Sequence, residues 1–263
     1  MRQRYPTGWS KVLPEVLRAS LIIAWKNIKV EYRNSLLGFL WSFIHPLGLL
    51  AVFALVFSAI LGLDLREYGA YLLVGLTVWR TIAHCTTQVM SSVRQQRALI
   101  NSTPIHMLSI PLGNAFSSLF HSMGDLLALL VVGVLVLGIK LTPASTLIIP
   151  VLLVTHVFTL GIAMALASFY AEYDDVGYLA DIYLNLLFFS VPVVYPLDNI
   201  SPLLKRAILI NPYTHMLTMA RSVVLQGALP QASSIAYTLL ASIASLAAGY
   251  LIFKSREERY YLG

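Results

Sequence analysis

The 30 residues from Asn34 to Leu63 carry no formal charge, and this stretch constrains the fold of the chain more than any other feature. A helix needs about 20 apolar residues to cross the roughly 30 Å hydrocarbon core of a bilayer. The stretch is therefore long enough for a membrane span, although it contains His45 and Pro46. Pro46 is expected to remove a backbone hydrogen bond and bend the helix. A bend with His45 beside it suits either a helix that lines a hydrated path or a simple packing kink.

Composition places the whole chain in the same class. Of its 263 residues, 58% are hydrophobic and 11% are charged, whereas soluble domains carry roughly 25% charged residues. Too little polar surface is present to cover a water-facing globule. The single cysteine, Cys85, excludes an internal disulfide. No secretory signal peptide is predicted, because the basic residues of the N-terminal segment are spread along its length and the apolar run is too long.

The hydropathy pattern predicts an all-α polytopic membrane protein with six spans. Six spans place both termini on the same side of the membrane. With the termini inside, the cytoplasmic segments hold twelve Lys and Arg residues and the external segments hold five. This asymmetry predicts a multi-pass protein of the cytoplasmic (inner) membrane with both termini cytoplasmic. The expected spans are Leu36–Leu61, Tyr68–Val89, Leu108–Leu137, Thr146–Phe169, Val176–Tyr195 and Ile235–Phe253.

Residues 1–34 are predicted to form a cytoplasmic amphipathic helix in the membrane interface, ahead of a transmembrane domain of residues 35–263. Apolar residues recur at helical spacing on one face, and basic residues on another face are expected to meet lipid headgroups. The helix either anchors the chain or moves as a gate against the first span. The apolar face comprises Leu13, Leu17, Leu21, Ala24 and Ile28, and the basic face comprises Arg18, Lys26, Lys29 and Arg33.

Residues 196–234, between the fifth and sixth expected spans, mix prolines with apolar stretches. Backbone at membrane depth must pair its own polar groups, which short helices do. We therefore expect short re-entrant or interfacial helices here.

Several kinds of chemistry find no support in the sequence. It contains no G-x-x-x-x-G-K-[ST] phosphate loop, no H-E-x-x-H and no G-x-S-x-G. The six histidines lack metal-ligand spacing, so we expect no metal site, no catalytic residue and no cofactor bound by this chain. We expect no nucleic-acid partner. Arg80 and Asp125 are ionisable residues inside expected spans, and they are either functional or paired with each other or with backbone.

Four short stretches, in order along nearly the whole chain, carry a family resemblance. They are YRNSLLGFLWSFIHP from Tyr32, PIHMLSIP from Pro104, SVPVVYPLD from Ser190, and Asn211-Pro212. Together they resemble the permease subunits of ABC-2-type polysaccharide exporters, which export O-antigen, capsule or teichoic acid.

The resemblance implies a permease of an ATP-driven exporter that moves a lipid-linked polysaccharide across the cytoplasmic membrane. ATP and magnesium are then bound by a separate ABC ATPase, expected in two copies on a homodimer of this chain. Asp174 stands where family members often carry an Arg in the loop after the fourth span, so the role of that Arg is not carried over. The residues expected to couple to the ATPase are Arg94, Arg97, Leu99, Pro104, His106, Asp174 and Asp175. Pro104 is expected to form the corner between a short interfacial helix and the third span, because the residue before a proline is pushed out of the α region.

Aromatic side chains on the first and fifth spans suggest how a glycan is conducted, because rings stack on the apolar faces of sugars. An aromatic belt at the membrane interface is the competing interpretation. The residues expected to face the translocation path are His45, Pro46, Phe53, Phe57 and Tyr195. Two other functions stay open from the sequence: an ABC-2 permease for a drug or lipid, and an integral-membrane transferase that uses His45 or Asp125.

Overall fold

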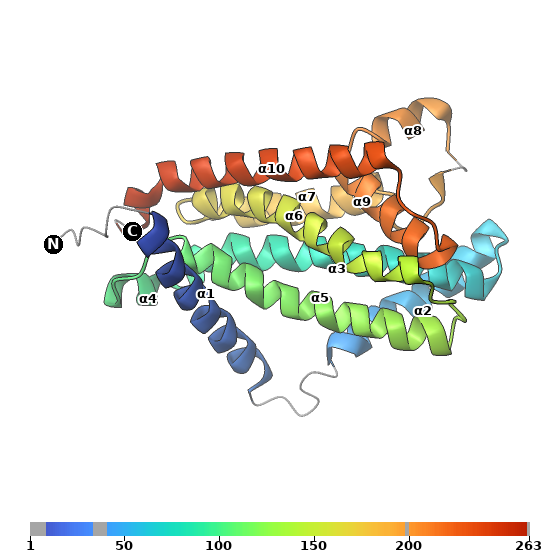
Figure 1. Ribbon diagram of the computed structural model, residues 1–263, viewed down its shortest axis with the longest axis horizontal. Helices are drawn as coiled ribbons and strands as arrows, with labels where there is room; N and C mark the ends of the chain where they lie inside the picture. Colours follow the sequence, from blue (N-terminus) through green and yellow to red (C-terminus); the bar gives the residue numbers. More distant parts are fainter. Residues whose placement is uncertain (1–8, 34–40, 198–199, 262–263) are drawn as a thin grey trace.

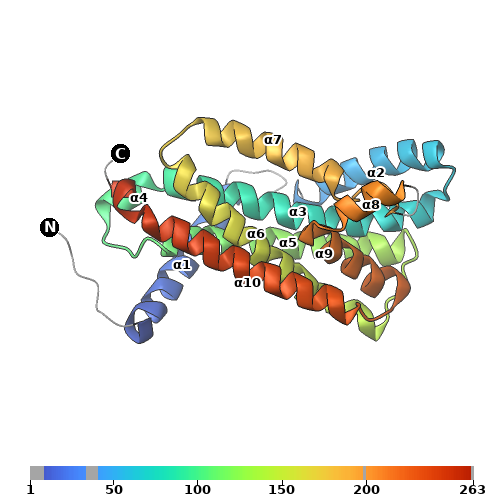
Figure 2. The same ribbon diagram turned by 90° about the horizontal axis from the view of Figure 1, so that it is seen from above.

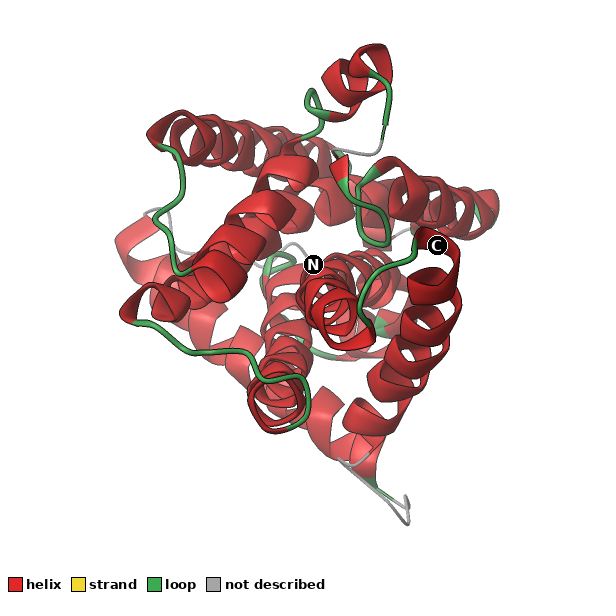
Figure 3. Ribbon diagram, turned by 90° about the vertical axis from the view of Figure 1, so that its right-hand side faces the viewer, coloured by secondary structure: helices red, strands yellow, loops and turns green. Residues whose placement is uncertain are grey.

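The computed structural model describes residues 9–33, 41–197 and 200–261. Within these ranges the regular structure is helical, and no strand occurs (Figure 3). The main helices are α1 (Trp9–Tyr32), α2 (Trp41–Leu61), α3 (Leu65–Gln95), α4 (Arg97–Ser102), α5 (Ser109–Leu135), α6 (Ile148–Tyr170), α7 (Asp175–Ser190), α8 (Pro202–Ile208), α9 (Pro212–Arg221) and α10 (Ala232–Ser255). Short helical turns complete the described chain: η2 (Pro143–Leu147), η4 (Ser222–Gln226) and η5 (Glu257–Tyr261).

The long helices lie lengthwise beside one another and form a bundle with two distinct ends (Figures 1 and 2). One end holds α4, the turn between α6 and α7, and the C-terminal end of α10; we call it the α4 end. The other holds α8, α9 and the connection between α2 and α3; we call it the α8 end. Helix α1 begins near the α4 end and crosses the bundle obliquely.

Each of the six expected spans contains a long helix, but not all of these helices are equally apolar. Within the part of the chain that the structure describes, three segments are long and apolar enough to cross a membrane: Ser109–Leu135, Pro143–Tyr170 and Ala232–Ser255. In α2 the described apolar part, Leu47–Ile60, is shorter. The count of six spans therefore stays a prediction, while the all-helical architecture is confirmed.

The fifth expected span ends earlier than predicted. We expected it to reach Tyr195, whereas α7 stops at Ser190. The reason is Pro192, which has no amide proton and forces the preceding residue out of the helical region. Val191 accordingly adopts extended φ and ψ angles of −93° and 135°. The second expected span is longer than predicted, since α3 continues past Val89 to Gln95.

Helices α3, α5, α6 and α10 form the centre of the bundle, and α6 packs against both α3 and α10. Two glycines set the distance between α6 and α10. A Cβ added at Gly161 would meet the backbone of Ser245, and one added at Gly249 would meet the backbone of Gly161. Small residues at such crossings let helix backbones approach closely, as is common between helices in membranes.

Helix α1 uses a face that the sequence pattern did not single out. Val12, Val16 and Ile23 are buried, and α1 packs on α5. The leucines of the predicted apolar face, Leu13, Leu17 and Leu21, are exposed instead. The helix therefore has a protein-contacting face in addition to the apolar and basic faces. The leucines of the apolar face point away from the bundle, whereas Ala24 of the same face is buried.

The segment between α7 and α10 divides into an exposed and a buried helix. On α8, Leu203 is 82% exposed and Ile210 follows it with a similarly exposed side chain. Helix α9 is largely buried and packs against α3, α6 and α10. The part of this segment that returns into the bundle is thus α9.

Candidate functional site

The α4 end brings together several residues that were expected to couple to an ATPase. Arg94, in the last turn of α3, forms an ion pair with Asp174 at the start of α7. Arg97 opens α4 and donates a hydrogen bond to the Ala171 carbonyl at 3.2 Å. The end of α3 and the start of α4 are therefore bound to the turn that precedes α7. Asp175 is exposed in the first turn of α7 and does not take part in the ion pair between Arg94 and Asp174.

Pro104 lies at the corner between α4 and α5, as predicted. Thr103 before it is extended, with φ −135° and ψ 131°, as expected for a residue that precedes proline. Leu99, on α4, packs against the apolar cluster at this end of the bundle. His106 follows in the connection, and its Nδ1 accepts a hydrogen bond from the Leu108 amide at 3.3 Å. Partial burial lowers the pKa of His106, which favours the neutral imidazole that this bond requires.

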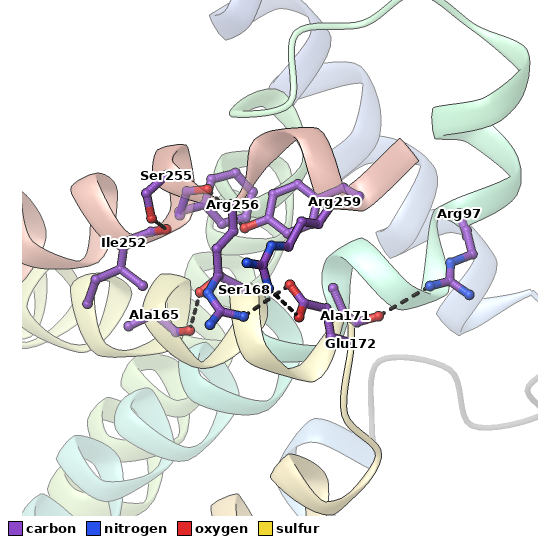
Figure 4. A network of polar contacts seen from close by, with 11 residues as sticks. Arg97, Ala165, Ser168, Ala171, Glu172, Ile252, Ser255, Arg256 and Arg259 are labelled. Atoms are coloured by element: carbon purple, nitrogen blue, oxygen red, sulfur yellow. Dashed lines mark hydrogen bonds and ion pairs between the residues drawn. The ribbon is translucent and has the colours of Figure 1, made fainter. Parts of the chain in front are cut away.

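The sequence argument missed three residues at this end. Glu172 accepts hydrogen bonds from Arg256 and Arg259, at 3.0 and 3.1 Å, one on each carboxylate oxygen (Figure 4). Both arginines follow α10, and Glu172 follows α6. The charge pattern becomes a usable signal only once α6 and α10 are known to be neighbours. Helix α6 is followed by an acidic run and α10 by REER, whose two arginines meet the acidic run where the helices end.

The aromatic residues expected on the translocation path fall into two groups. Phe53 and Phe57 of α2 belong to a cluster at which α2, α3 and α7 meet. Phe53 lies 6.1 Å from Phe188 between ring centroids, and Trp79 of α3 lies 5.1 Å from the same ring. These rings pack against one another within one chain and are partly buried.

Tyr195 lies apart from that cluster, in the non-helical segment that follows α7. Its hydroxyl donates to the Phe189 carbonyl at 2.8 Å, and its own carbonyl accepts from the Tyr71 hydroxyl at 2.9 Å. His45 and Pro46 lie in the second turn of α2 as it is described, and their side chains are outside the described residues. The five expected path residues are thus distributed over two regions of the chain.

Arg221, at the end of α9, is a structural centre that the sequence argument counted only as an external basic residue. Its guanidinium donates to the carbonyls of Pro192 and Val193 at 2.8 and 2.7 Å, and to the Tyr71 hydroxyl at 2.7 Å. Tyr68 donates to the Val194 carbonyl. These donors satisfy carbonyls that lose their helical partners where α7 ends.

Arg80 and Asp125 pair with each other, one of the alternatives left open by the sequence. Arg80 Nε donates to a carboxylate oxygen of Asp125, which is 2% exposed. One helical turn away on each helix, the rings of His84 and His121 stack at 5.0 Å. His121 also contacts Glu31 of α1 at 3.0 Å between Nε2 and Oε2. A continuous row of polar groups therefore joins α1, α5 and α3.

Among the described residues, no group of three or more His, Cys, Asp or Glu side chains is placed to hold a metal ion. Most of the charged side chains described above form ion pairs or donate hydrogen bonds to backbone carbonyls. Positioning of helices is the role that such an arrangement performs.

Comparison with known proteins identifies the family. The model of the ABC-2 type transporter family matches residues 18–225. The chain belongs to this family. The match includes α1 from Arg18 onward and runs through α9 into η4. It therefore covers α4, the turn between α6 and α7, and Arg221, but not α10 or the segment that follows it. The resemblance noted in the sequence motifs is thereby confirmed.

Relatives within the family share much of the chain's length. The O-antigen export system permease protein RfbA of Myxococcus xanthus is 27% identical over 237 residues, which cover 89% of this chain and 91% of the relative. A permease of the same name from Klebsiella pneumoniae is 26% identical, over 80% of this chain and 81% of its own length. The polysialic acid transport protein KpsM of Escherichia coli is 20% identical, over 89% of this chain and 91% of its own length.

Proposed function

We propose that this chain is the membrane-spanning permease subunit of an ATP-driven exporter that moves a lipid-linked polysaccharide across the cytoplasmic membrane. The observation that carries the proposal is the family membership, together with relatives over most of the chain whose names specify O-antigen export and polysialic acid transport. An O-antigen or a similar glycan is the substrate class that these names favour.

The energy source is a separate ABC ATPase, bound in two copies. The sequence supports this division of labour, because it lacks the phosphate loop that such an ATPase uses to hold ATP and magnesium. The docking region is the α4 end, with α4 itself and its flanking corner at Pro104 presented at the end of the bundle (Figure 1). Arg94, Arg97, Leu99, His106, Asp174 and Asp175 are the proposed coupling residues.

Six helices cross the membrane: α2, α3, α5, α6, α7 and α10, with the α4 end and both termini in the cytoplasm. The distribution of Lys and Arg supports this orientation. Helix α7 is the shortest of the six, with 16 residues and a length of about 24 Å. The following non-helical segment extends it, since donors from Arg221 and Tyr68 satisfy the segment's carbonyls, which backbone at membrane depth requires.

The working unit is a homodimer, and the glycan path runs between the two copies. Helices in one bundle pack at about 8–10 Å, which leaves little room for a pyranose chain inside six spans. A two-fold dimer is the commonest symmetric assembly. Helices α2 and α7 face the path, with His45, Pro46, Phe53, Phe57 and Tyr195. Helix α1 lies in the membrane interface as an anchor or gate, with its exposed leucines towards lipid and Arg18, Lys26, Lys29 and Arg33 towards headgroups.

The decisive test is genetic and biochemical. Deleting the gene should leave a lipid-linked glycan on the cytoplasmic side of the membrane, and expression of the chain should restore its surface display. Affinity purification of the chain should recover an ABC ATPase. Normal surface glycan in the deletion strain would contradict the proposed substrate. Accumulation of a drug or a simple lipid would instead indicate another ABC-2 substrate, and purification without any ATPase would favour an enzyme such as a membrane transferase.

A further inference from the structure

The turn between α6 and α7 is contacted by segments from three other parts of the chain. Its residues Ala171, Glu172 and Asp174 receive, respectively, Arg97 from α4, the two arginines that follow α10, and Arg94 from α3. Three residues of one turn thus join α3, α4 and the C-terminal segment. The hydrogen bond from Arg97 and the ion pairs from Arg256 and Arg259 meet at this turn (Figure 4). It is the polar connection between the C-terminal segment and α4, beside the apolar cluster that Leu99 and Ile100 share with Phe253 and Tyr260.

The C-terminal segment, residues 256–260, is itself firmly placed. Tyr260 is 2% exposed, its hydroxyl donates to the Phe253 carbonyl at 2.9 Å, and its ring lies 5.0 Å from that of Phe253. The Arg256 guanidinium lies over the Phe169 ring at 4.1 Å, which adds a cation–π contact to its ion pair. The segment therefore folds back on α6 and α10 and does not simply trail from the last helix.

The contact between this segment and the turn uses the whole Glu172 carboxylate. Arg256 bonds one oxygen and Arg259 the other, and the Glu172 side chain is only 19% exposed. Hydrogen bonds between ionised partners are stronger than neutral ones, and partial burial reduces screening by solvent and salt. Such a clamp fixes the direction in which the turn presents the carbonyl of the preceding residue, Ala171, to Arg97.

We propose that Arg256 and Arg259 are positioning residues for the coupling helix α4, acting through Glu172 and the Ala171 carbonyl. The C-terminal segment and α4 then move as one unit, so that a displacement of α4 is carried to the end of α10. The consequence for export rests on the proposed function, because it assumes that the ATPase acts on α4. The placement of α4 by the C-terminal segment does not depend on that assumption.

The first test measures placement alone, on the purified full-length protein in lipid nanodiscs. The double variant Arg256→Gln/Arg259→Gln should raise amide hydrogen exchange several-fold in residues 97–102, which neither substitution touches. The matched control is Arg66→Gln/Arg206→Gln, which removes two exposed arginines at the α8 end. It should leave exchange at residues 97–102 unchanged. Faster exchange confined to residues 256–261 would overturn the proposal.

The second test uses the complex with its ATPase and compares glycan exported per ATP hydrolysed. Arg97→Gln and the C-terminal double variant should each lower this ratio several-fold, and their combination should be no worse than either, because both break the same connection. Arg256→Lys/Arg259→Lys keeps both charges and should recover most of the ratio. Fully additive losses would overturn the inference. If the wild-type complex shows no ATP-dependent export, the proposed function fails, whereas the exchange result stands or falls separately.

Discussion

At the scale of single residues, Arg221 illustrates how this chain uses a buried charge. Its partners are carbonyl and hydroxyl oxygens, together with the face of the Tyr71 ring at 3.4 Å; no carboxylate is among the contacts the structure gives it. The planar guanidinium presents several donors in a fixed geometry, which a lysine ammonium does not reproduce. Gly75 leaves the space for it, because a Cβ there would lie 2.8 Å from the guanidinium and 2.9 Å from the Val193 carbonyl.

Replacing Arg221 by Lys should therefore destabilise the protein strongly. A single ammonium cannot satisfy the carbonyls of Pro192 and Val193 in their present positions, and each buried carbonyl left without a donor costs about 1–3 kcal/mol. The thermal unfolding midpoint in detergent measures the effect. Arg206→Lys, on the exposed helix α8, is the control and should unfold like the wild type. An Arg221→Lys protein of unchanged midpoint would show that the guanidinium is not needed.

His106 provides a pH-dependent prediction. Burial lowers its pKa below the ordinary value of 6.5, so folding favours the neutral ring. The stability that neutral His106 contributes is complete above pH 6.5 and is lost as the pH falls through the lower pKa of the folded state. His106→Asn keeps a hydrogen-bond acceptor that does not titrate. The thermal unfolding midpoint of His106→Asn should fall less than that of the wild type between pH 6.5 and 5. An equal fall of the midpoint in both proteins would rule out a pH-dependent contribution of His106 to stability.

At the scale of secondary structure elements, the attachment of α1 to α5 is the feature that sequence patterns resolved least. The predicted leucine stripe exists, but a second set of residues at positions 12, 16, 20 and 23 makes the protein contact. The polar part of that contact consists of Asn27 to Asn114 at 3.0 Å and Glu31 to His121. Amphipathic periodicity identifies a helix and its apolar side. Whether a given side of the helix contacts lipid or protein depends on the partner surface, here the part of α5 at Gly113, where Ser20 and Ile23 of α1 approach closely.

Gly113→Val should displace α1. A Cβ at this position would lie 2.7 Å from the Cβ of Ile23, within a helix contact and away from flexible side-chain ends. Ser20→Cys reports the displacement, since Ser20 is 0% exposed and the natural Cys85 is buried. Maleimide should label Ser20→Cys several-fold faster when Gly113→Val is also present. Gly48→Val, on α2 with open space around the position, is the control and should not change labelling. Equal labelling in both would refute the close contact.

Sequence alone established the helical class, the location of the long helices and the corner at Pro104. It missed the early end of α7, although Pro192 was visible, because an apolar run continues through Val194. It also missed Glu172 with Arg256 and Arg259, and the role of Arg221. These contacts join residues that are far apart in sequence, so no local periodicity reports them. Charge complementarity between neighbouring helix ends predicts them only when the neighbours are already known.

At the scale of the whole molecule, the exposed surface of α7 bears on the proposed assembly. Tyr178, Ile182, Leu186 and Phe189 recur at intervals of three or four residues along α7, and all are exposed in the single chain. They form one continuous face next to α2, whose Phe53 contacts Phe188 of α7. In lipid this face needs no partner, but in the proposed dimer it lies beside the path between the two copies.

The dimer predicts that single cysteines on this face meet their counterparts. Leu186→Cys, at a residue that is 67% exposed, should form a disulfide between two copies in native membranes under mild oxidation, and a bulky maleimide there should reduce glycan export severalfold. Leu240→Cys on α10, where the leucine is 68% exposed, is the matched control. It carries the same substitution on an equally exposed apolar face away from α7, so it should neither cross-link nor block export when labelled. If Leu186→Cys behaves like the control, or the active complex contains one copy of the chain, the path does not run between two copies along α7.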